Sequence, residues 1–156
     1  MINELKKVWI RLPESVDGFP PFEIESVWAE KKGEFWRIDN IPFYAVGLSY
    51  NDNVSVNFLD GKLWYLKTEV YSKFSTLRVI SYSADITLAI RSKLSELGCA
   101  TEASNVANCF AVSVPEKVDY NDVATVLNLY FSKNLLDYEE SSIRHGGVKT
   151  ECVGTS

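Results

Sequence analysis

Runs of hydrophobic residues that favour strands, separated by turn residues, recur through the first half of the chain, and residues 54–58 alternate between apolar and polar with a period of two. This pattern predicts strands over residues 7–12, 22–30, 34–38, 54–58 and 63–70. The pair Asp60-Gly61 suits a tight hairpin turn, because both central positions of that turn need positive φ. Short strands joined by tight turns indicate a small curled β-sheet or a barrel.

One stretch, residues 37–50, interrupts the strand pattern. It starts as a strand, breaks at Asn40 and reaches Pro42, which fixes its own φ and has no N–H to donate to a ladder. The strand must therefore bend or end before Pro42. Apolar residues, Phe43 among them, follow up to Gly47 and indicate burial. We interpret this corner as a structural joint.

The second half changes to a mixed pattern of strands and helices. Ser83 and Asp119 are suited to cap two helices, and Gly98 and Asn134 to end them in the left-handed conformation. Apolar residues fall on one face of each helix. The predicted elements are a strand at 75–81, a helix, a weak strand or loop edge at 100–104, a strand at 109–114, a second helix and a strand at 135–143. This order is the split β-α-β order of ferredoxin-like folds.

The expected fold class is therefore α+β. A curled sheet or barrel over residues 1–74 is expected to pack on a ferredoxin-like βαββαβ half over residues 75–145, as one compact unit. Residues 146–156 lose the pattern and are expected to form a flexible tail.

Composition is that of a globular protein with a substantial core. The chain has 156 residues, of which 46% are hydrophobic and 13% aromatic. It contains no apolar run long enough to cross a bilayer, and its N-terminus lacks the apolar core of a signal peptide, so we expect a cytoplasmic protein with no membrane partner. The three cysteines form no CxxC motif, which favours reduced thiols and neither a metal site nor a cofactor.

Acidic residues outnumber basic ones, and the imbalance is uneven. Residues 1–78 carry 10 basic and 11 acidic side chains, whereas residues 79–156 carry 6 and 10, which together give the net charge of −5. An acidic protein is repelled by nucleic-acid phosphates and attracted to basic proteins, so we expect no nucleic-acid partner. Solubility alone is an alternative explanation of this charge.

The densest acidic cluster is Asp137, Glu139 and Glu140. In a strand the first two share one face and Glu140 points to the other. Three interpretations remain open: a solvated sheet edge, a docking patch, or paired carboxylates for acid–base or metal chemistry. For a docking patch, Asp119 and Asp122 complete the candidate partner-binding set.

Other candidate groups have simple structural explanations. His145 precedes two glycines and is expected to be solvated rather than catalytic. The tryptophans and tyrosines resemble a base-stacking platform, but acidic residues accompany them as often as lysine does, so core and sheet packing is preferred. Arg78 lies in a strand made for burial and therefore needs a carboxylate or an anionic ligand. We favour a carboxylate pair that ties the two halves together.

Several segments together resemble a bacterial family, the domain of unknown function 4265. The segments are Glu25-Ser26-Val27-Trp28-Ala29, Trp36-Arg37-Ile38-Asp39-Asn40-Ile41-Pro42-Phe43, Gly47-Leu48-Ser49 with Asp52, Ser75-Thr76-Leu77-Arg78-Val79, Leu97-Gly98-Cys99 with Glu102, Val112-Ser113-Val114-Pro115 and Asp137-Tyr138-Glu139-Glu140. The resemblance implies a small bacterial cytoplasmic protein and brings no catalytic residues. Members of the family look similar to immunity proteins of bacterial toxin systems.

The expected function is that of an immunity protein rather than an enzyme. Such a protein binds a cognate toxin domain, here expected to be a nuclease, and covers its basic active cleft with an acidic surface. The alternative is a small-ligand-binding protein or an enzyme, with a site near the Asn40–Phe43 corner and Arg78.

Overall fold

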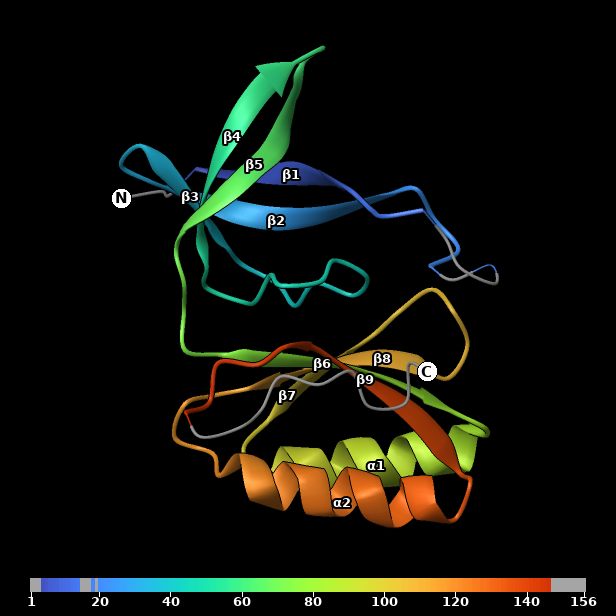
Figure 1. The fold of residues 1–156 in the computed structure, drawn as a ribbon. Coiled ribbons are helices and arrows are strands. Elements are labelled where there is room, and N and C mark those ends of the chain that lie inside the picture. Colours follow the sequence, from blue (N-terminus) through green and yellow to red (C-terminus); the bar gives the residue numbers. More distant parts are fainter. Residues whose placement is uncertain (1–3, 15–17, 19, 147–156) are drawn as a thin grey trace. The chain divides into compact units, whose positions relative to one another are not determined.

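The computed structural model describes residues 4–14, 18 and 20–146 (Figure 1). The expected tail after Gly146, including Cys152, lies outside these residues, as do the first three positions. The chain divides into two compact units, Met1–Ser72 and Lys73–Ser156. Each unit is described by itself.

The first unit is a closed barrel of five strands in sequential order. The strands are β1 (Leu5–Arg11), β2 (Ile24–Lys32), β3 (Phe35–Ile38), β4 (Asn53–Leu59) and β5 (Lys62–Val70). Successive strands pair antiparallel, and a parallel pairing of Val8 with Leu63 and of Trp9 with Trp64 joins β1 to β5. The curled sheet or barrel expected from the strand pattern is thus confirmed.

Local residue chemistry sets the turns of the barrel. Asp60 and Gly61 have φ of 52° and 75°, the positive values that the tight β4–β5 turn requires. Most inward positions of the strands are apolar, with Glu25 as an exception, and they alternate with outward positions that are mostly polar or aromatic. The barrel core consists of Val8, Ile10, Val27, Ala29, Trp36, Ile38, Ala45, Leu48 and Val54.

The second unit has the predicted ferredoxin-like order. Its elements are β6 (Ser75–Ser81), α1 (Ala84–Leu97), β7 (Ala100–Ala103), β8 (Cys109–Val114), α2 (Tyr120–Ser132) and β9 (Leu136–Ser142). The sheet order is β7-β8-β6-β9, and every neighbouring pair is antiparallel. Both helices cover the same face of this sheet (Figure 1).

The helix ends form as their sequences predict. The Ser83 hydroxyl accepts from the N–H of Ile86 at 3.2 Å, and the Asp119 carboxylate accepts from the N–H of Asn121 at 2.9 Å. Gly98 ends α1 with φ of 105°, and a Cβ at this position would lie 3.1 Å from the Val118 side chain. The end of α1 therefore lies against the segment that leads into α2.

The core of the second unit lies between the helices and the sheet. Leu77, Phe110, Ile90, Leu94 and Leu127 are fully buried there. Burial of each such side chain stabilises the fold by about 1.5–3 kcal/mol. Across residues 4–14, 18 and 20–146, no helix is long and apolar enough to cross a membrane.

Candidate interaction surfaces

The acidic cluster on β9 is divided between the two faces of its sheet. Asp137 is half-buried and accepts a hydrogen bond of 2.7 Å from the Tyr82 hydroxyl, which raises the pKa of Tyr82. Glu140 lies on the helix-covered side, is 8% exposed and accepts from the Tyr120 hydroxyl. Burial, and then this hydrogen bond, raise the pKa of Tyr120. Glu140 therefore acts within the fold.

Glu139 forms an ion pair with Arg78, its cross-strand neighbour on β6. The side chains are 15% and 8% exposed, so both charges are largely removed from water. The sequence correctly predicted a carboxylate partner for Arg78. This pair joins β6 to β9 within the second unit, and that it ties the two halves together stays a prediction. The strand register explains the pairing, because Arg78 and Glu139 stand directly opposite each other on β6 and β9.

Asp119 and Asp122 differ from the β9 carboxylates, since both are exposed on α2. Asp119 caps the helix and Asp122 lies in its first turn, where negative charge is favoured by the helix dipole. The five candidate residues thus do not form one surface. Their role in binding a partner stays a prediction, and the exposed part of the set is the α2 pair.

His145 is half-buried and hydrogen-bonded, so the expectation of a solvated histidine is wrong. Its Nε2 lies 3.0 Å from the Pro115 carbonyl and 3.1 Å from the Val118 carbonyl, so this nitrogen carries the proton and donates. Nδ1 consequently accepts from the Ser75 hydroxyl at 2.6 Å. The Ser75 oxygen also accepts from the N–H of Arg144 and is fully buried, so this serine is not exposed as a nucleophile.

The two cysteines within the described part of the chain are buried thiols. Burial raises the pKa of Cys99 to about 11 and also raises the pKa of Cys109. Both thiols are therefore protonated and weakly nucleophilic at neutral pH. Among residues 4–14, 18 and 20–146, no three His, Cys, Asp or Glu side chains are grouped so that they could hold a metal ion.

The corner after β3 is held by side chains that accept backbone hydrogen bonds. The Asn40 amide oxygen accepts from the N–H of Trp28 at 2.6 Å. The Glu25 carboxylate accepts from three consecutive N–H groups, at 2.5 Å from Phe43, 3.1 Å from Tyr44 and 2.9 Å from Ala45. The loop runs past Pro42 without a ladder, and these bonds satisfy its backbone.

A second carboxylate holds the end of the same loop. Asp52 is fully buried and accepts from the N–H of Ser49 at 2.9 Å and of Ser72 at 2.8 Å. The interpretation of the corner as a structural joint is consistent with these contacts. Burial differs along the corner, because Phe43 is half-buried while its neighbours Tyr44 and Ala45 are buried.

Sequence reasoning missed the role of Glu25. A signal for it exists: Glu25 has the same strand parity as Val27 and Ala29, which both point into the barrel. A carboxylate at an inward position needs several hydrogen-bond donors. A loop that pairs with no strand has backbone N–H groups that can donate to it. The two observations together could have paired Glu25 with the 43–45 segment.

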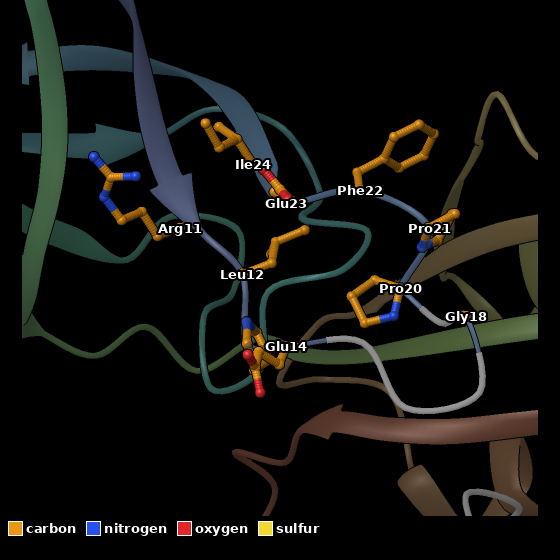
Figure 2. Close-up of a pocket in the computed structure, with 10 residues that line it drawn as sticks. Arg11, Leu12, Glu14, Gly18, Pro20, Pro21, Phe22, Glu23 and Ile24 are labelled. Atoms are coloured by element: carbon orange, nitrogen blue, oxygen red, sulfur yellow. The ribbon is translucent and has the colours of Figure 1, made fainter.

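The connection between β1 and β2 encloses a pocket of about 900 Å³. In Figure 2, Leu12 and Pro20 face into this space, whereas the side chains of Arg11 and Phe22 extend away from it. Its further lining includes Glu14 and Glu23. The pocket is broad and loop-lined, so it resembles a surface for a partner more than a closed ligand site.

Comparison with known proteins identifies the family. A family model described as Domain of unknown function (DUF4265) matches residues 25–138. The chain belongs to this family. The match begins at Glu25 and includes Asn40, Asp52 and Arg78, so the family's segment contains the loop-holding side chains described above.

A solved structure with a similar fold comes from Neisseria gonorrhoeae and is described as a hypothetical protein. The two chains align over 100% of each, with a TM-score of 0.69 and 20% sequence identity. At this identity the likeness supports the fold alone. No curated protein matches the chain.

Proposed function

We propose that this protein is an immunity protein, which binds and neutralises a cognate bacterial toxin domain. The observation that supports a binding role is that the reactive groups singled out in the sequence are committed to the fold. His145 bonds to Ser75 and to two carbonyls, and Arg78 pairs with Glu139. These groups hold the fold together. We therefore look for function in the binding of a partner by the protein surface.

The contact surface that we propose is the acidic start of α2, defined by Asp119 and Asp122. Both side chains are exposed, and the end of α1 lies beside them through the contact of Gly98 with Val118. Glu96 adds an exposed carboxylate in the last turn of α1. A nuclease toxin carries a basic cleft for its substrate, and an acidic face accelerates association with such a cleft.

The alternative, a ligand site near Asn40–Phe43 and Arg78, has less support. The charge of Arg78 is matched by Glu139, and the Asn40 amide oxygen is bonded to the N–H of Trp28. Neither group therefore calls for an additional anionic or polar ligand.

The double substitution Asp119→Asn with Asp122→Asn tests the surface. Asparagine caps helices about as well as aspartate, so the fold is retained while two charges are removed. With the toxin domain encoded by the gene directly upstream, we expect stopped-flow association at low salt to be about tenfold slower, because steering by charge acts on the association rate. The difference should shrink as salt is raised.

Asp85→Asn is the matched control for this experiment. Asp85 is the corresponding first-turn acid of α1 and is also exposed, but α1 runs antiparallel to α2 and starts at the other end of the helix pair. It should change the association rate by less than about twofold. Equal rates for the α2 double variant and the wild type would remove this surface from the proposal.

A further inference from the structure

Three cations stack on three indole rings over adjacent strands of the barrel. The Lys7 ammonium lies 5.3 Å from the ring centre of Trp28, and the Lys62 ammonium lies 4.9 Å from that of Trp9. The guanidinium of Arg11 lies 4.4 Å from the ring centre of Trp64. These distances are typical of cation–π contacts. We call the set of Lys7, Arg11, Lys62, Trp9, Trp28 and Trp64 the cation–indole face.

Strand register explains why these side chains gather. Val8 and Ile10 point into the barrel, so the alternating positions of β1 point outward. Lys7 stands opposite Trp28 on β2, and Trp9 stands opposite Trp64 on β5. The sequence favoured core and sheet packing for the tryptophans. Trp36, at 4% exposed, fits that expectation, whereas Trp28 is 49% exposed and lies on the outer surface of the barrel.

The face carries positive charge on an acidic protein. The outward positions of this part of the barrel include three cations and no carboxylate. They run from Leu5 to Arg11 on β1, from Ile24 to Trp28 on β2 and from Lys62 to Trp64 on β5. The next outward carboxylate on β2 is Glu30, which pairs with Lys32 at 2.6 Å and Arg37 at 3.3 Å. The local charge is therefore opposite in sign to the net charge of −5.

Apolar groups and a hollow adjoin the cations. A pocket of about 290 Å³ is lined by Arg11, Trp64, Tyr65, Asn57 and Leu59. This volume is at the lower end of ligand pockets, enough for a side chain or two of a partner. Leu59 is 56% exposed at the end of the β4–β5 hairpin, where it stands opposite Lys62. Exposed apolar groups beside charges are typical of protein interfaces.

We propose that the cation–indole face binds an acidic segment of a partner protein. Carboxylates complement the three cations, and apolar side chains of the same segment contact Leu59 and the indole edges. This surface is separate from the proposed toxin contact, since it lies on the other unit and has the opposite charge. Each proposal can therefore fail without the other.

Two observations favour a protein segment over a nucleic acid. Each outward indole of this face has a cation over its ring, and that cation occupies the surface on which a base would stack. A long polyanion is also repelled by the net charge of −5, while a short acidic segment meets the local positive charge.

Tryptophan fluorescence provides the test, because the indoles themselves report binding. The probe is a short synthetic peptide of glutamate and leucine, titrated into the full-length protein. The triple variant Lys7→Gln, Arg11→Gln, Lys62→Gln should raise the Kd by about tenfold or more, since it removes three exposed charges. The single variant Lys7→Gln should also raise the Kd, by a smaller factor. It replaces the triple variant in the test if the triple variant folds poorly.

Lys31→Gln is the matched control. Lys31 stacks at 5.0 Å on Trp36, the buried fourth tryptophan, so its removal deletes a cation–indole contact outside the face. It should leave the Kd within about twofold. The proposal is overturned if the peptide does not bind, if a glutamine–leucine peptide binds equally well, or if the Kd is the same for the wild type and Lys7→Gln. Tighter binding of an oligothymidylate of equal charge would also overturn it, in favour of single-stranded nucleic acid.

Discussion

Glu25→Ala is expected to destabilise the first unit by about 3–5 kcal/mol, because each buried donor left unpaired costs about 1–3 kcal/mol. The carboxylate accepts from the N–H groups of Phe43, Tyr44 and Ala45, and Glu25 itself is only 8% exposed. Alanine offers no acceptor to any of the three. The loop after β3 has no ladder partner for these donors, so it must open to water or shift.

This effect can be assigned to one unit by the choice of probe. The four tryptophans, Trp9, Trp28, Trp36 and Trp64, all lie in the first unit, so the fluorescence transition in urea reports its unfolding. The helical circular dichroism signal reports α1 and α2 of the second unit. Glu25→Ala should lower the stability measured by tryptophan fluorescence.

Glu23→Ala is the matched control for that measurement. Glu23 has the same side chain two positions earlier, and it is exposed. Its replacement should change the free energy of unfolding by less than about 0.5 kcal/mol, as surface substitutions do. If the two alanine variants were equally stable, the carboxylate of Glu25 would not be what holds the loop.

The second large effect is expected at the Arg78–Glu139 pair. Glu139→Ala removes the carboxylate that stands opposite the Arg78 guanidinium, whose side chain is 8% exposed. Breaking a buried pair from one side typically costs about 3–5 kcal/mol, because the remaining charge is poorly solvated. The loss should appear in the helical circular dichroism transition, since β6 and β9 belong to the second unit.

A double variant distinguishes the effect of breaking the ion pair from the effect of losing side-chain packing. Arg78→Met with Glu139→Leu removes both charges and keeps the volume apolar, so it should be more stable than Glu139→Ala alone. If the double variant were the less stable of the two, the ion pair would not account for the cost. Surface pairs such as Lys67–Glu69, 3.8 Å apart and exposed on the lysine side, should matter far less.

Most of the fold could be predicted from the sequence because its signals are local. Runs of β-favouring residues between turn residues predicted the barrel strands, and Asp60-Gly61 predicted the hairpin turn that the positive φ values confirm. Ser83, Gly98 and Asp119 set the helix ends through contacts within a few residues. The ferredoxin-like order followed from the sequence of elements alone.

The contacts that could not be predicted join residues far apart in the chain. Glu25 meets its donors 18 to 20 positions later, and His145 meets Ser75 across 70 positions. The expectation for His145 failed because it considered only the neighbouring glycines, and not the carbonyls of Pro115 and Val118. The cation–indole face depends on the parallel β1–β5 register, for which the sequence gives no local signal.

The candidate binding residues were predicted by charge, and the structure separates them by environment. Periodicity correctly placed Glu140 on the opposite face from Asp137 and Glu139. It could not show that Glu139 and Glu140 are tied to Arg78 and Tyr120, since those contacts depend on tertiary packing. Charge substitutions at these two positions would therefore alter folding as well as any binding.

The most direct test of the proposed immunity function is a growth measurement. The gene directly upstream in the source genome is expressed in a host with and without this protein. We expect its product to stop growth alone, and we expect growth to be restored when the wild-type protein is produced together with it. Growth arrest that persists although both proteins are produced and folded, or an upstream product that is harmless alone, would contradict the account.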